Sequence, residues 1–235
     1  MTPWMWFLIA GLTAVAGSAL LAADHGAHSA HQRERRRWAA LRGWRFVVSD
    51  PVLTERWRHG AIAGTGLARD LVTGSLFTPL GRRLVQVFDH VQGGQVAQVV
   101  VAVQRRVCDA DLVVELWLPQ GPVTPVPGLT KLGRVGDRIA LVSDADQARA
   151  LVSAEFAFAV NALGQDIPLA WLEQDWVLAT APWTASPSRL ERLLRALDEI
   201  ADLLDMAADE ETVDTAEIAD LAELASWADK AHQTN

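Results

Sequence analysis

Three histidines, His25, His28 and His31, have the residue type and the spacing that could hold a metal ion. On a helix, side chains three residues apart share one face, so their imidazoles could converge on a cation such as Zn²⁺. No further ligand stands nearby to complete a coordination shell. The pattern therefore favours surface histidines, and the sequence predicts no metal site.

Motifs for catalysis or cofactor binding are equally sparse. Gly64-Thr65-Gly66 resembles the start of a dinucleotide-binding loop, but Arg69 stands where a third small residue must allow close helix packing. A turn is the simpler interpretation. The sequence contains neither a phosphate-binding Gly-x-x-x-x-Gly-Lys loop nor a Gly-x-Ser-x-Gly elbow. It therefore predicts a protein that is not an enzyme, with no catalytic residues and no cofactor.

An apolar segment at residues 1–23 predicts a transmembrane helix. It carries no charge from Pro3 to Ala23, and ~1.5 Å of rise per residue makes this run long enough for the ~30 Å hydrocarbon core. Trp4, Trp6 and Phe7 would sit at its outer interface, where amphipathic rings are favoured. We therefore expect a membrane anchor.

Residues 24–42 follow as a basic juxtamembrane segment. By the positive-inside rule its arginines place the rest of the chain in the cytoplasm, as a single-pass protein of the inner membrane. Arg35, Arg36 and Arg37 are expected to contact anionic lipid head groups. Small residues near the end of the apolar run would alternatively allow cleavage of a signal peptide, and the domain would then lie outside the membrane.

Runs of β-branched and apolar residues predict an α+β fold, an antiparallel sheet with helices on one face. The expected strands are Trp44–Val48, Leu71–Phe77, Leu84–Val91, Val96–Gln104, Leu112–Leu118, Arg138–Val142, and a hairpin of Pro168–Glu173 with Asp175–Ala181. The expected helices are 51–57 capped by Asp50, 145–163 capped by Asp144, and a long helix opened by a capping box of Ser188 and Glu191. Four prolines make Pro119–Gly136 an expected loop.

Domain organisation is expected to follow these elements. Residues 43–207 form the cytoplasmic domain, and Val-Val-Ser-Asp and Leu-Val-Ser-Asp before two helices suggest related halves at about 43–120 and 137–207. Residues 208–235 form an acidic amphipathic helix or tail, which either folds back on the domain or docks on another protein. The net charge of −8 argues against nucleic acid as a partner.

Several diffuse motifs together resemble a known family. They are Gly43-Trp44, Ser49-Asp50-Pro51 before Trp57, Arg69-Asp70-Leu71-Val72-Thr73-Gly74, Val99–Gln104 and Trp176. This set resembles the trehalose monomycolate transport factor A proteins of mycolate-producing actinobacteria. The resemblance implies a non-enzymatic accessory factor that acts with a resistance-nodulation-division transporter of trehalose monomycolate.

Four residues are expected to bind the partner: Arg69, Asp70, Trp183 and Trp227. Arg69 and Asp70 lie in an expected loop, where a salt-linked turn is the alternative, and Trp183 could instead pack over a helix end. A different class of function also remains open, a membrane-tethered domain that binds a small ligand or lipid head group. A sizeable apolar pocket would favour that alternative. An envelope hydrolase would require the signal-peptide orientation.

Overall fold

The computed structural model describes residues 29–62, 66–79, 81–119 and 127–208. The expected anchor with Trp4, Trp6 and Phe7 lies outside these residues, as does Trp227 of the expected tail helix. Within the described ranges, no helix has the length and apolar character needed to cross a bilayer. The membrane anchor therefore stays a prediction from the sequence.

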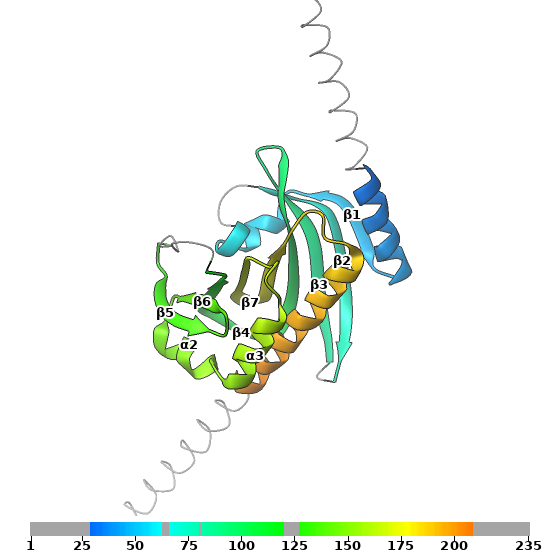
Figure 1. Cartoon of the computed structure of the whole chain (residues 1–235). Coiled ribbons are helices and arrows are strands. Elements are labelled where there is room, and N and C mark those ends of the chain that lie inside the picture. The colour runs from blue at the N-terminus through cyan, green and yellow to red at the C-terminus, as the bar shows by residue number, and fades with distance from the viewer. Residues whose placement is uncertain (1–28, 63–65, 80, 120–126, 209–235) are drawn as a thin grey trace, which may run out of the picture.

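Seven antiparallel strands form one sheet (Figure 1). They are β1 (Arg45–Asp50), β2 (Leu67–Thr78), β3 (Gly81–Gln92), β4 (Gln95–Trp117), β5 (Thr130–Val135), β6 (Arg138–Val142) and β7 (Leu169–Ala181). Neighbours follow the order β1-β2-β3-β4-β6-β5, and β7 pairs with β4. Residues 99–103 of β4 pair with both β3 and β7, so those strands lie on opposite edges of β4. The α+β class and the antiparallel sheet are confirmed.

Two strands are longer than the sequence pattern predicts. β4 runs through both expected strands at 96–104 and 112–118, with register shifts against β7 on either side of Asp109. The expected hairpin at 168–181 is wrong, because β7 is a single strand. Gln174 takes a positive φ of 57°, which bends the chain locally without reversing it. The paired long strands connect the two expected halves, whose relatedness stays a prediction.

Alternating side chains give the sheet two apolar faces. In β4, Val99 and Val101 point into one core while Val100 points into the other. The helices pack on the first face, and the second is covered by two 3-10 turns, η1 (Leu53–Arg56) and η2 (Gly60–Ile62). The expectation of helices on one face is therefore confirmed.

The helix expected at 145–163 is two helices, α2 (Ala145–Leu151) and α3 (Ala154–Ala162). The Asp144 carboxylate accepts hydrogen bonds from two backbone N–H groups of the first turn, which confirms this cap. The Ser153 hydroxyl caps the second helix by accepting from the N–H group three residues on. The apolar period continues across this break, which is why it predicts one helix.

Two local expectations need correction. Asp50 accepts hydrogen bonds from the N–H groups of Val52 and Leu53, as a cap should, but only the short turn η1 follows in place of a helix over 51–57. The expected loop at 119–136 contains β5, which pairs with β6 at the edge of the sheet. Its glycine and few apolar residues gave no strand pattern.

Two further helices cover residues 29–41 and 187–208. The second buries the whole expected apolar stripe of Leu190, Leu193, Leu194, Leu197, Ile200, Ala201 and Leu204. Its cap is Ser186, whose hydroxyl accepts the Arg189 N–H at 3.4 Å. The expected capping box of Ser188 and Glu191 is therefore wrong, since the Glu191 carboxylate binds other side chains.

Candidate functional site

The helix at 29–41 leads from the expected anchor and is built into the folded domain. The Arg35 guanidinium, only 2% exposed, lies 3.1 Å from the Asp89 carboxylate of β3. Gln32 donates a 2.7 Å hydrogen bond to the Asp70 carboxylate of β2. Removing one partner of a buried ion pair leaves an uncompensated charge, so the pair holds the helix in one position on the sheet.

The other end of this helix is tied to the last helix. Trp38 Nε1 donates to Glu191 Oε1 at 2.9 Å, and the Arg42 guanidinium lies 2.7 Å from the same oxygen. These hydrogen bonds hold the pKa of the Glu191 carboxyl below its usual range. The Trp38 and Trp44 rings pack edge to face, with their centroids 5.4 Å apart. The helix therefore belongs to the domain at both of its ends, although the sequence pattern predicts a separate juxtamembrane segment over residues 24–42.

The three arginines that were expected to contact lipid differ in their exposure. Arg35 is buried with Asp89, and its guanidinium points into the protein, so the expected lipid contact of Arg35 is wrong. Arg36 and Arg37 are exposed, and Arg36 lies 6.0 Å from the centre of the Phe46 ring. Lipid contact stays a prediction for Arg36 and Arg37.

The structure places Arg69 and Asp70 in β2 and not in a loop. Asp70 is buried, takes a positive φ of 51° at a bulge, and accepts the hydrogen bond from Gln32. Its carboxylate therefore serves the domain and does not reach a partner. Arg69 is half-buried, while Trp183 is 44% exposed in the turn before the last helix. Partner binding by Arg69 and Trp183 stays a prediction.

The histidines do not form a site in the described part of the chain. His25 and His28 lie outside it, and His31 Nε2 accepts a hydrogen bond from Arg35. Among the described residues, no group of three or more possible ligands is arranged to hold a metal ion. Gly66, from the expected turn, packs closely against the buried His90 ring, and burial lowers the pKa of His90.

Two buried carboxylates hold the backbone of the loop before η2. Glu173 on β7 accepts the N–H groups of Arg58 and His59 at 2.7 and 3.1 Å. Glu115 on β4 accepts the Gly60 N–H at 2.7 Å and, through its other oxygen, the indole N–H of a nearby tryptophan. Carboxylates engaged in this way stabilise the loop that covers the second face of the sheet.

An acid–arginine network joins the last helix to the sheet. The Arg83 guanidinium on β3 lies 2.8 Å from Asp205 and 3.3 Å from Asp198, and it also contacts Asp202. The fully buried Asp205 accepts the Arg106 backbone N–H at 3.1 Å. Burial, and next the nearby Asp202 carboxylate, raise the pKa of Asp198 to about 6. Acidic side chains of the last helix therefore already bind arginines of the sheet.

One stretch of β2 extends beyond its partner strand. β1 begins at Arg45, opposite Thr73, so residues 74–78 of β2 have no strand beside them on that side within the described chain. Trp44 lies against Gly74, where a Cβ would overlap the indole ring. A surface groove of about 360 Å³ runs along this open edge. We call it the β2-edge groove.

The lining of the β2-edge groove combines positive charge with apolar surface. Its charged residues are Arg42, Arg45 and Arg82, and its large apolar residues are Trp44, Phe77 and Leu84. Phe77, at the β2–β3 turn, is 85% exposed. A lining of this kind fits an acidic amphipathic segment, because carboxylates can pair with arginines while apolar side chains cover the rings.

Sequence reasoning missed the β2-edge groove as a site. The pair Gly43-Trp44 and the glycine at 74 were noticed only as family motifs. Arg82 lies eight positions after Gly74 but 38 after Trp44, and it reaches the groove because β2 and β3 form a hairpin. The one available signal was Gly74, which is small enough for the Trp44 ring to pack against it. This signal can be recognised only when the positions of the two residues in the sheet are known.

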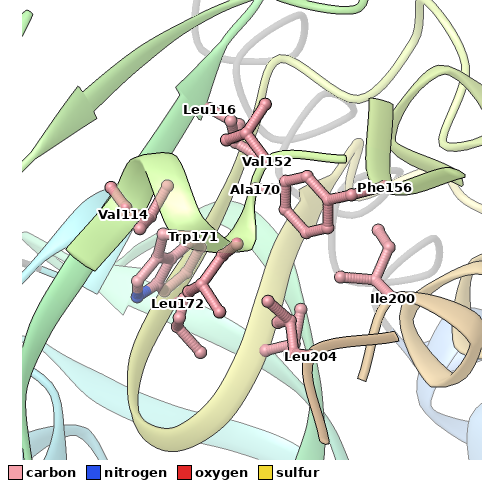
Figure 2. Close-up of a pocket in the computed structure, with 12 residues that line it drawn as sticks. Val114, Leu116, Val152, Phe156, Ala170, Trp171, Leu172, Ile200 and Leu204 are labelled. Carbon is pink, nitrogen blue, oxygen red and sulfur yellow. The ribbon is translucent and has the colours of Figure 1, made fainter. Parts of the chain in front are cut away.

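A small apolar cavity lies inside the molecule between the helices and the sheet (Figure 2). Phe156 of α3 and Ile200 and Leu204 of the last helix line it, together with Val114 of β4 and Leu172 of β7. Its volume of about 20 Å³ is room for one water molecule. Small-molecule pockets begin near ~300 Å³, so this cavity does not fit a lipid head group.

Comparisons with known proteins identify the family. A family model described as trehalose monomycolate transport factor TtfA matches residues 1–226. A curated relative, "Trehalose monomycolate transport factor A" of Mycolicibacterium smegmatis (strain ATCC 700084 / mc(2)155), is 25% identical over 200 residues, which are 84% of this chain and 69% of the relative.

A solved structure supports the same assignment. The crystal structure of the mycobacterial trehalose monomycolate transport factor A matches with a TM-score of 0.65 and 25% identity, over 74% of this chain and 94% of that chain. The resemblance inferred from the sequence motifs is therefore confirmed. This chain belongs to the trehalose monomycolate transport factor TtfA family.

Proposed function

We propose that this protein is a membrane-anchored, non-enzymatic accessory factor for the transport of trehalose monomycolate across the inner membrane. Membership of the family, matched from residue 1 to residue 226, is the observation that carries the proposal. Residues 1–23 hold the chain in the membrane as a single span, and the domain lies in the cytoplasm. Its partner is a transporter of the resistance-nodulation-division type.

The docked helix at 29–41 supports this role. Because Arg35 and Trp38 fix the helix on the domain, an anchor joined to it would present the domain to the membrane in a restricted set of orientations. Confinement near the membrane raises the effective concentration of a partner there, so a weak contact can be populated. Exposed Arg36 and Arg37 add attraction to anionic lipid.

The interior between helices and sheet favours the accessory role over a ligand sensor. The internal cavity of about 20 Å³ has no room for a small ligand. The β2-edge groove is larger, at about 360 Å³, but it is an open surface groove lined by arginines and not the apolar pocket that a ligand sensor would need. The buried carboxylates Glu115 and Glu173 are occupied by backbone N–H groups, which suits a structural part better than proton transfer. Partner contact is proposed for the exposed Trp183 ring and for Arg69.

The test is affinity purification of the full-length protein from native membranes, followed by identification of the co-purifying proteins. We expect the full-length chain to retain the transporter and a variant lacking residues 1–23 to lose most of it. A third variant, with an unrelated single-pass helix in place of residues 1–23, restores recovery if confinement is what the anchor supplies. Recovery of no transporter by the full-length chain would refute the accessory role.

Trp183→Ala tests the contact surface in the same experiment. We expect it to reduce recovery of the transporter several-fold, because an exposed aromatic ring at an interface carries a large share of the binding energy. Phe158→Ala is the matched control, since Phe158 is also exposed but lies on α3. Equal recovery with the two variants would remove Trp183 from the proposed interface.

A further inference from the structure

The β2-edge groove presents unpaired backbone beside charged and apolar side chains. Within the described residues, no strand pairs with residues 74–78 of β2 on the side of β1. Open strand edges in folded proteins are usually covered, charged or used for binding. Here the edge carries Phe77, which is largely exposed, and it is flanked by Arg45 and Arg82. A covering segment should therefore be acidic and partly apolar.

The C-terminal residues 209–235 have this chemistry. They contain eight acidic residues, Asp209, Glu210, Glu211, Asp214, Glu217, Asp220, Glu223 and Asp229. Lys230 is their one lysine, and they contain no arginine. Ile218, Leu221 and Leu224 recur every three residues, a spacing that gives a helix one apolar face. Charge and apolar pattern thus both complement the groove.

The chain leaves the described structure within reach of the groove but on the other face of the sheet. Asp205, one turn before residue 208, contacts Arg83, whose side chain points to the helix face of β3, while Arg82 and Leu84 point to the opposite face and line the groove. Residues 209–235 would span ~40 Å as a helix and about twice that when extended, so the distance is easily covered. The segment would also continue the pairing of acids with strand arginines that Asp198 and Asp205 begin.

We propose that the acidic C-terminal segment, residues 209–235, docks in the β2-edge groove of its own chain. Its carboxylates pair with Arg45 and Arg82, while Arg42 stays paired with Glu191, and its apolar face covers Trp44 and Phe77. The docked segment shields the open edge of β2 from other chains. This inference rests on the fold and the charges alone and does not depend on the transport role.

The bilayer is a poorer occupant of the groove. The helix at 29–41 spans about 20 Å and separates the expected membrane anchor from Arg42, where the groove begins. If this helix stands upright from the membrane, an anionic lipid head group near Arg36 and Arg37 does not reach the groove. An acidic segment of the same chain has no such constraint and is present at high effective concentration.

Hydrogen exchange of the full-length protein in detergent micelles tests the proposal against a chain ending at residue 208. Docking should slow exchange of the backbone amides of residues 74–78 several-fold in the full-length protein. β5, at the opposite end of the sheet order, serves as the internal reference and should exchange equally in both chains. Unchanged rates at 74–78 with a stable β5 would overturn the proposal.

A charge-reversal pair provides a second, independent readout in the full-length chain. Arg45→Glu with Arg82→Glu should abolish the protection of residues 74–78, because like charges would then face the acidic segment. Arg149→Glu with Arg192→Glu is the matched control, with the same change in net charge at exposed positions on α2 and the last helix. Protection that persists in the first pair contradicts docking by charge.

Dilution separates docking within one chain from docking between two. Protection of residues 74–78 that is independent of protein concentration supports the proposal. Protection that disappears on dilution would show that the segment binds a second copy, which overturns docking within one chain. Raising the salt concentration should weaken the protection, because the distance over which exposed charges attract each other shortens from about 10 Å at 0.1 M salt to about 3 Å at 1 M.

Discussion

Asp198 lies on the last helix, beside Arg83 of β3 and close to Asp202. Burial is the larger cause and the Asp202 carboxylate the second cause of the rise in the pKa of Asp198 to about 6. Because the folded-state pKa exceeds the unfolded value near 3.8, the folded protein binds the proton more tightly. Stability from this group is therefore present at low pH and is lost as the pH rises from about 4 to about 6.

Asp198→Asn should raise the free energy of unfolding at pH 7.5 by about 1 kcal/mol, a figure discounted because this side chain is partly solvated. At pH 4, where the folded-state carboxyl is already protonated, the gain should nearly vanish. Urea denaturation at the two pH values measures the difference. Glu34→Gln, at an exposed position of the helix at 29–41, is the control and should change little at either pH. A loss of stability at pH 7.5 would mean that the ion pair with Arg83 outweighs the burial of Asp198.

Single residues were predicted well where their chemistry is local. The Asp144 cap was correct because a carboxylate beside the first turn binds N–H groups that are close in sequence. Asp50 also accepts such N–H groups, but the helix that it was expected to cap is wrong. Glu191 was misassigned, since its partners Trp38 and Arg42 lie about 150 positions away in the chain. Asp70 was misjudged for the same reason, because its partner Gln32 belongs to a different element.

At the scale of elements, the pair of Arg35 and Asp89 decides how the helix at 29–41 sits on the sheet. Asp89→Asn should lower the free energy of unfolding by ~3 kcal/mol, because it leaves the Arg35 charge buried without its counter-ion. Chemical denaturation of the full-length protein measures this loss. Arg36→Met, one position along on the exposed face, is the control and should change stability by less than about 0.5 kcal/mol.

A double variant sharpens that prediction. Arg35→Met with Asp89→Leu removes both charges, so much of the lost stability should return. A double variant no more stable than Asp89→Asn would show that the geometry of the pair, and not the uncompensated charge, is what holds the helix.

Elements were predicted best where the apolar period is unbroken. β6 and the buried stripe of the last helix were located correctly, since each pattern repeats without interruption. β7 was divided in two because Gln174 and its polar neighbours look like a turn, although pairing with β4 carries the strand through. Strand pairing between distant segments is not visible in local periodicity, and it overrode the local preference here.

At the scale of the whole molecule, the family was recognised from dispersed motifs, but the groove was not. Each family motif is a short continuous segment, such as Gly43-Trp44 or the stretch from Arg69 to Gly74, so it can be recognised from the sequence alone. The β2-edge groove needs the strand register that brings Arg82 beside Ser75. Sites assembled from several elements by tertiary contacts require the fold before they can be found.

The proposed orientation in the membrane can be measured directly. In a Cys108→Ser background, Arg149→Cys puts one thiol at an exposed position on α2. A reagent that cannot cross membranes should leave this thiol unlabelled in intact cells and label it after lysis, if the domain is cytoplasmic. Labelling in intact cells would place the domain outside the membrane and would revive the signal-peptide interpretation.

The docked helix at 29–41 also sets the limit for any shortened fragment. A fragment that starts at residue 43 would remove Trp38 and Ala39 from the interior and strip Asp89 and Glu191 of their counter-charges. Such a fragment would expose the apolar surface that Trp38 and Ala39 cover, and it would be prone to aggregate. A self-sufficient fragment must therefore keep this helix from at least Gln32, whose amide binds Asp70, several turns ahead of the first strand.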